Sequence, residues 1–177
     1  MSRKLSCRGL LATTCLLASA AIYAGVEDMD PEDDYSSHRD APGPEWKEQT
    51  VVIPSYPRAE DLIEVDVSLY EFPFALFIDR KSLSVGKDGV IRYTAVLRSA
   101  NGVENVSYEG IRCRHSKVQR YAYGSGGEFR PVRNSEWRFI RKDGQDRFRT
   151  ELVNHYFCPL PMGDQERQIL DKLKGRD

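Results

Sequence analysis

The sequence predicts an α+β fold, in which an antiparallel sheet of about six strands forms a meander and a disulfide pins a C-terminal helix to it. Three observations carry this prediction. Apolar and polar residues alternate with a period of two over much of the chain, turn signals recur about every ten residues, and two of the four cysteines lie beyond the N-terminal segment. Such short spacing favours strands joined by hairpins over parallel strands joined by helices.

Most of the chain after residue 62 is expected to form strands. In the first of them Ile63, Val65 and Val67 alternate with polar residues, which is typical of a half-buried strand. Asp88-Gly89 favours a tight hairpin turn, because such turns need positive φ angles. The glycine-rich segment 124–127 predicts another hairpin loop. The expected strands are, in order, 63–69, 74–79, 83–85, 90–98, a run through Tyr108 and Cys113, 119–123 and 135–141.

The alternation within 90–98 also predicts which side chains face the core. One set of alternate residues is almost entirely apolar and is expected to point inward, whereas the other set is polar and is expected to face outward. The inward residues are Ile91, Tyr93, Ala95 and Leu97, and the outward residues are Arg92, Thr94 and Arg98.

A helix is expected to begin at Asp146, whose carboxylate can cap it, and to end at Cys158, just before Pro159. Its apolar face follows intervals of three and four residues. That face comprises Phe148, Leu152, His155 and Tyr156. A short second helix at 164–174 is expected to be weakly docked, with Ile169, Leu170 and Leu173 as its apolar stripe.

The N-terminal segment is organised like an export signal. Three basic residues precede an apolar run at 10–21, and Ala24 offers a small-residue cleavage point. The apolar run is about a dozen residues, short of the roughly 20 that a membrane-spanning helix needs. We therefore predict a signal peptide at 1–24, cleavage after Ala24, a periplasmic location and no transmembrane span in the mature chain.

Lipid attachment at Cys15 is the alternative to cleavage after Ala24. A lipoprotein signal needs Gly or Ala directly before the cysteine, but Thr14 stands there. The apolar run also continues past Cys15. Both departures disfavour a lipid anchor.

The segment 25–45 is predicted to be an acidic, disordered linker. It holds eight acidic residues, one arginine and three prolines. Such a segment buries too little apolar surface to offset the conformational entropy that it would lose on folding. An acidic tail that binds a partner is the second interpretation. We expect a single domain at 46–160 and a C-terminal tail or short helix at 161–177.

Cys113 and Cys158 would be the cysteines of the mature chain. In an oxidising compartment they are expected to form one disulfide, which would join a strand to the end of the helix. Zinc is the alternative, because Cys113-x-His115 and His155-x-x-Cys158 could together supply four ligands. The disulfide is the default in such a compartment, so we predict neither a metal site nor another cofactor.

A basic and aromatic region spans 112–149. It contains eleven Lys or Arg residues against four acidic ones, interleaved with aromatic rings. Such a surface suits anionic ligands, through charge attraction and stacking. The alternative is structural, with rings in the core and arginines in water. The candidate ligand-binding residues are Arg112, Arg114, Arg120, Tyr121, Tyr123 and Arg138.

Enzyme motifs are not evident. The spacings of Gly-x-Ser-x-Gly, His-Glu-x-x-His and the phosphate loop do not occur. Glu109 beside Arg112 has two interpretations, a buried acid with a catalytic pKa or an ion pair along the strand. We therefore predict no catalytic residues.

The motifs around the two cysteines resemble the cryptic neisserial protein family. They comprise Tyr108-Glu109-Gly110-Ile111-Arg112-Cys113, Tyr121-Ala122-Tyr123-Gly124, Trp137-Arg138 and Tyr156-Phe157-Cys158-Pro159. The resemblance implies an exported protein of Gram-negative bacteria with no established activity. A looser likeness, over 79–113, is to surface adhesin E, an antiparallel sheet with a helix fixed at its end.

The leading hypothesis for function is a non-enzymatic envelope module. It would bind a partner protein or an anionic component of the envelope. A nucleic acid is not expected as the natural partner because the chain is predicted to be exported. A small periplasmic hydrolase with an unrecognised active site is the alternative, and the sequence leaves the oligomeric state open.

Overall fold

A computed structural model describes residues 45–67 and 72–175 of the chain. The predicted signal peptide at 1–24 lies outside the described residues, as does all but the last residue of the predicted linker. The described part holds one compact unit. Its strands are β1 (Leu62–Val65), β2 (Phe74–Val85), β3 (Val90–Ser99), β4 (Glu104–Arg112), β5 (Lys117–Ser125), β6 (Glu128–Pro131) and β7 (Arg138–Phe139). Its helical elements are η1 (Ala59–Asp61), η2 (Gly144–Asp146), α2 (Arg147–Glu151), η3 (Leu152–Phe157) and α3 (Gln165–Leu173).

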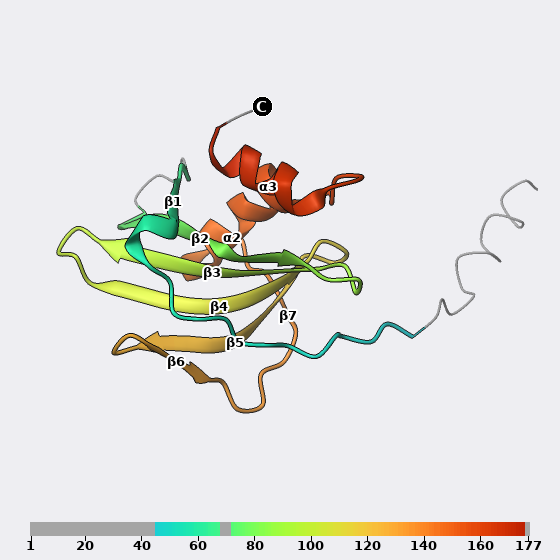
Figure 1. The fold of residues 1–177 in the computed structure, drawn as a ribbon, viewed down its shortest axis with the longest axis horizontal. Helices are drawn as coiled ribbons and strands as arrows, with labels where there is room; N and C mark the ends of the chain where they lie inside the picture. The colour runs from blue at the N-terminus through green and yellow to red at the C-terminus, as the bar shows by residue number, and fades with distance from the viewer. Residues whose placement is uncertain (1–44, 68–71, 176–177) are drawn as a thin grey trace, which may run out of the picture. The chain divides into compact units, whose positions relative to one another are not determined.

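The predicted antiparallel meander is confirmed. The strands lie in the order β1-β2-β3-β4-β5-β6, each paired antiparallel with its neighbour, and the short β7 pairs with β5 (Figure 1). The two runs expected at 74–79 and 83–85 form one strand, β2, whose register shifts between Asp79 and Ser84. The run at 135–141 supplies only the two residues of β7.

The hairpin turns match the glycine signals. Gly89 has a φ of 73° in the turn between β2 and β3, where its N–H donates to the carbonyl of Gly86. Gly126 and Gly127 also have positive φ and join β5 to β6. The sequence predicted this second loop but not β6, because its four residues carry no apolar alternation.

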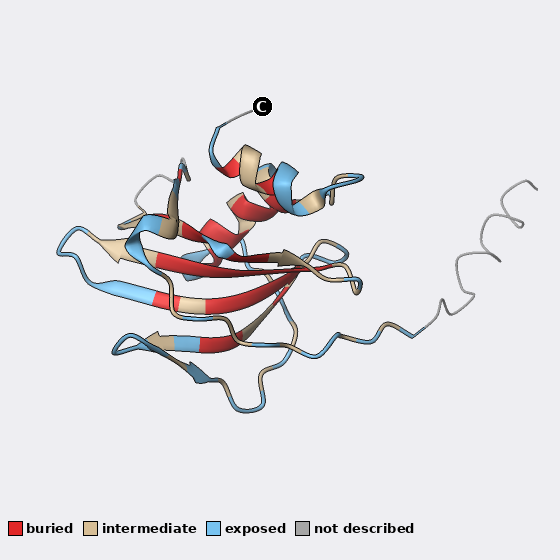
Figure 2. Cartoon of the chain, viewed as in Figure 1, coloured by how far each residue is buried: buried red, intermediate tan, exposed pale blue. Residues whose placement is uncertain are grey.

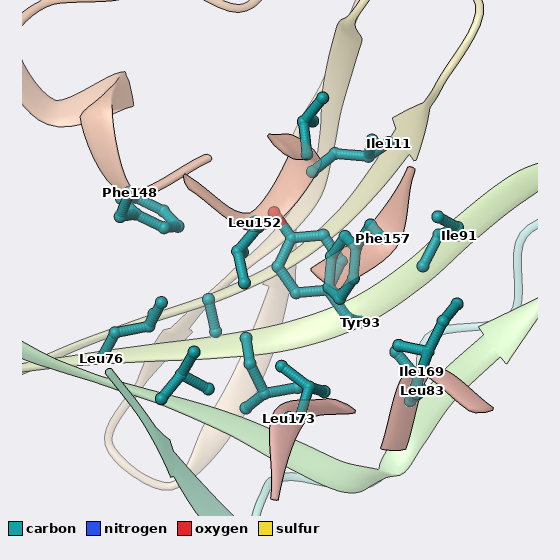
Figure 3. Packing of buried hydrophobic residues seen from close by; sticks show 14 of the residues in the cluster. Leu76, Leu83, Ile91, Tyr93, Ile111, Phe148, Leu152, Phe157, Ile169 and Leu173 are labelled. Atoms are coloured by element: carbon teal, nitrogen blue, oxygen red, sulfur yellow. The ribbon is translucent and has the colours of Figure 1, made fainter. Parts of the chain in front are cut away.

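Helices cover one face of the sheet, here called the inner face. Side chains from α2, η3 and α3 pack there against inward residues of the central strands (Figure 3). Tyr93 lies edge-on to Phe157, with ring centroids 5.0 Å apart. Ile169 and Leu173 of α3 are also buried, so α3 is part of the core and the expectation of weak docking is wrong.

The helix predicted at 146–158 is irregular. A 3₁₀ turn and the short α2 lead into η3, a π-helical segment, in which Cys158 N–H donates to Val153 O at 3.1 Å. Because π-helical bonds join residues five apart, Val153 and Phe157 reach the core and the expectation that His155 faces inward is wrong. Asp146 stands at the N-cap position, but its carboxylate makes no cap bond.

The opposite, outer face of the sheet carries residues 45–58, which run along it without regular secondary structure (Figures 1 and 2). The Trp46 indole donates to the carbonyl of Asp88 at 2.8 Å. Glu48 and Asp88 both pair with Arg92. Arg92 and Thr94 face outward, as the alternation predicts, but both are buried, and Arg92 lies among these carboxylates.

Candidate functional site

The polar centre of the inner face is Glu109 of β4, which is completely buried. Its carboxylate accepts five hydrogen bonds. The Arg149 guanidinium donates two of them, with Nε 2.6 Å from Oε2. The other three come from Arg120 Nε at 2.9 Å, Ser107 Oγ at 2.8 Å and Tyr93 Oη at 3.1 Å. Such full pairing is what a buried carboxylate needs in order to remain charged.

The two arginines decide the protonation state of Glu109. Burial alone would raise the pKa of its carboxyl, but the charges and hydrogen bonds of Arg149 and Arg120 outweigh burial and lower the pKa to about 2. Burial and the neighbouring charge of Glu109 raise the pKa of Tyr93 well above its usual value. Glu109 is therefore a fixed anion at neutral pH and Tyr93 a neutral donor.

A second carboxylate extends the network toward the surface. Asp146 accepts from Arg149 Nη1 at 2.7 Å and from Arg138 Nη2 at 2.8 Å. Hydrogen bonds from Arg138 and from the Arg141 backbone overcome the effect of burial and lower the pKa of Asp146. The carboxylate expected to cap the helix thus ties α2 to β7.

A β-bulge sets the direction of the two candidate residues on β5. Tyr108 pairs with Ala122 whereas Glu109 pairs with Arg120, so Tyr121 is an extra residue in β5. Residues three apart in a regular strand face opposite sides, but a bulge reverses the alternation. Arg120 and Tyr123 therefore share the inner face, where Arg120 Nη1 donates to Tyr123 Oη at 2.5 Å.

Beside this pair lies a cavity of about 260 Å³, here called the Arg120 cleft. It opens between the inner face, at the ends of β3, β4 and β5, and the residues of η2 and α2. A wider hollow next to it shares Arg120, Gln145 and Arg149 and adds Arg138 and Arg141. The cleft is lined by Phe72, Phe74, Leu97, Glu104, Asn105, Val106, Ser107, Arg120, Tyr123, Gly124, Gln145, Phe148 and Arg149.

Comparison with known proteins identifies the family. The model of the CNP1-like family matches residues 41–174. The chain belongs to the CNP1-like family. It is also 25% identical, over 96% of its length and 93% of the relative's, to cryptic neisserial protein 1 of Neisseria gonorrhoeae (strain ATCC 700825 / FA 1090). No solved structure matches the chain significantly.

In this CNP1-like chain the structure divides the six candidate residues between separate places. Arg120, Tyr123 and Arg138 lie along the cleft and the adjoining hollow. Arg114 is exposed in the turn after β4. Arg112 and Tyr121 belong to the outer face, so these two and Arg114 do not share a site with the other three.

Arg112 and Tyr121 are occupied by the segment that crosses the outer face. The Arg112 guanidinium lies 3.5 Å from the ring centroid of Trp46. Tyr121 Oη donates to Glu48, whose other carboxylate oxygen accepts from Trp137 Nε1 at 3.1 Å. These rings and charges thus hold the chain's own 45–58 segment.

Arg149 and the partners of Glu109 were not predicted. The interpretation of Glu109 and Arg112 as an ion pair along the strand is wrong, because the two side chains point to opposite faces of the sheet. The signal available was the alternation itself, which places Glu109 on the same face as the apolar Ile111. A charged residue among inward residues requires a partner, and Arg149 follows the expected core residue Phe148.

The cysteines form the predicted disulfide. Cys113, just after β4, and Cys158, at the end of η3, are linked with a Cα–Cα distance of 5.6 Å. Both sulfur atoms are therefore bonded to each other and cannot act as the thiolate ligands that the zinc alternative requires. Among the described residues, no helix combines the length and apolar character needed to cross a membrane.

Proposed function

We propose that the chain is an exported, non-enzymatic binding module that holds a small anionic ligand in the Arg120 cleft. The observation that carries the proposal is the open edge of Arg120. Its Nε and Nη1 are engaged, but Nη2 has no hydrogen-bond partner among the described residues. The neighbouring Tyr123 hydroxyl accepts from Arg120, so its own proton is free for a ligand.

Two free donors in the lining of one cavity match the oxygens of a carboxylate or phosphate. Arg120 is held in place by Glu109 and Tyr123, which reduces the entropy lost when a ligand binds. About a quarter of its side chain (27%) is exposed, so the open edge can reach a ligand.

The protonation of Glu109 favours binding over hydrolysis. Ser107 Oγ donates to Glu109, the arrangement in which a carboxylate could activate a nucleophile. A carboxylate with a pKa of about 2 and five donors is a very weak base, however. His115 and His155 do not line the cleft, and His155 is exposed beside Glu151. The hydrolase alternative therefore gains no support here.

The location and organisation of the chain belong to the same proposal. The export-signal pattern at 1–24 and the acidic composition of 25–45 support a cleaved leader and a linker ahead of the domain. A disulfide is compatible with export to an oxidising compartment. Within the periplasm, an anionic component of the envelope or a protein that carries one would be the partner.

Calorimetric titration of the purified, disulfide-bonded chain tests this function. Small carboxylates, phosphate esters and acidic sugars are titrated at low and at high salt. We expect at least one class to bind at a single site with an affinity that falls as salt rises, because the ligand is anionic.

The matched variants are Arg120→Lys and Arg80→Lys. Lysine at 120 keeps a charge near Glu109 but loses the planar fork, so binding should weaken about tenfold. Arg80 pairs with Asp61 on the surface, so its replacement should leave binding unchanged. If no anion binds, or if both variants bind like the parent, the cleft is not the site.

A further inference from the structure

We infer that the ligand of the Arg120 cleft is a singly charged amphiphile, a medium-length alkyl carboxylate such as octanoate. The inference rests on the proposed function and names its ligand class. It follows from three properties of the cleft: an apolar wall, donors matched to one negative charge, and a small volume.

The apolar wall is built from side chains of two separate regions. Phe72 packs edge-on against Phe74, with ring centroids 5.7 Å apart, and tilts against Phe148 of α2 at 6.4 Å. Leu97 of β3 adds aliphatic surface. A sugar or a free phosphate would leave this wall in contact with water, whereas an alkyl chain would cover it.

The polar part of the lining suits a single negative charge. Arg120 Nη2 and the Tyr123 hydroxyl can together bind the two oxygens of a carboxylate. Glu109 already neutralises part of the charge of Arg120. A dianionic phosphate would meet more repulsion from the Glu109 carboxylate than a singly charged carboxylate would.

The volume sets the length of the alkyl chain. A cavity of about 260 Å³ lies just below the usual range for pockets that hold drug-sized ligands. At about 30 Å³ for each water molecule in the liquid, it would hold about nine waters. Octanoate, with about ten non-hydrogen atoms, is close to that size, and a sixteen-carbon chain would have to extend out of the cleft.

The experiment compares ligands that differ in one property at a time, by calorimetry on the purified, disulfide-bonded chain. Octanoate is the reference, octanol lacks the charge, butyrate lacks most of the chain, and octyl phosphate carries a larger charge. We expect octanoate to bind at one site, and octanol and butyrate each to bind at least about tenfold more weakly.

Two variants locate the binding within the cleft. Tyr123→Phe removes one hydroxyl and should weaken octanoate about tenfold, since it removes a hydrogen bond to a charged group. Tyr56→Phe is the matched control, because Tyr56 packs against Phe129 on the outer face and should leave the affinity unchanged. Phe74→Ala, checked for folding by thermal unfolding, should reduce the preference for octanoate over butyrate.

The results separate this inference from the function on which it rests. If octanoate binds no better than butyrate or octanol, or if Tyr123→Phe binds it like the parent, the ligand class is wrong. In that case, an acidic sugar or phosphate ester that still binds in an Arg120-dependent way would leave the proposed function standing. If none of these anions binds, both fail.

Discussion

Arg149 of α2 and Glu109 of β4 form a bidentate ion pair in the centre of the fold, although 40 residues separate them in the sequence. Both side chains are almost fully buried, Arg149 at 3% exposure and Glu109 at 0%. The pair joins the helical layer to the sheet and holds the guanidinium of Arg120 at the edge of the cleft. Several consequences can be measured.

Replacement of Arg149 should be strongly destabilising. Arg149→Met leaves Glu109 with Arg120 as its one cationic partner, and breaking a buried pair typically costs about 3–5 kcal/mol of unfolding free energy. Urea titration measures the loss. Adding Glu109→Gln to this variant should restore part of the stability, because the uncompensated charge is removed. Arg141→Met is the control, since its pair with Asp143 is exposed to solvent and its loss should leave the urea midpoint almost unchanged.

The unfolding free energy should decrease in acid because the Glu109 carboxylate becomes protonated. The folded state lowers the pKa of Glu109 from 4.5 to about 2, so its contribution is present above the unfolded pKa and is lost as pH falls through the folded one. A shift of this size corresponds to about 3 kcal/mol, lost between about pH 5 and pH 2. Urea unfolding at a series of pH values measures it. In Glu109→Gln the unfolding free energy should fall less steeply with decreasing pH. Equal slopes in the variant and the parent would show that Glu109 is not the group responsible.

The disulfide should stabilise the folded protein mainly by restricting the conformations of the unfolded chain. Cys113 and Cys158 are 45 residues apart, for which the chain-entropy model gives about 4 kcal/mol. The double variant Cys113→Ser/Cys158→Ser should lose stability of that order in urea titration. The parent protein, unfolded under reducing conditions, should show the same loss. A change below about 1 kcal/mol would show that the link adds little to the fold.

Gly110 is expected to be intolerant of a side chain. A Cβ at this position would lie 2.3 Å from Tyr121 Oη and 2.9 Å from two atoms of its ring. Gly110→Ala should therefore cost about 1–3 kcal/mol, because the Tyr121 ring has to move away from the strand and from Glu48. In combination with Tyr121→Ala, the two costs should be less than additive, which thermal unfolding of the four proteins can measure. Simple additivity would exclude the predicted clash.

The sequence was most informative where its signals are local. Alternation and glycine turns placed most strands, and the cysteine content named the disulfide. The aromatic and basic region yielded Arg120, Tyr123 and Arg138 of the candidate site. It also included Arg112 and Tyr121, because composition does not distinguish the two faces of a sheet.

The sequence by itself thus determined the antiparallel meander, the cross-link between Cys113 and Cys158 and the apolar side of β3, since each depends on neighbouring residues or on the cysteine content. Only the tertiary structure decided the partner of Glu109, the π-helical path that turns His155 outward, and the cover that buries Arg92. These depend on strand register, on one extra residue at Tyr121 and on contacts between segments about 40 residues apart. No local pattern encodes such contacts, because they form only when the layers of the fold pack together.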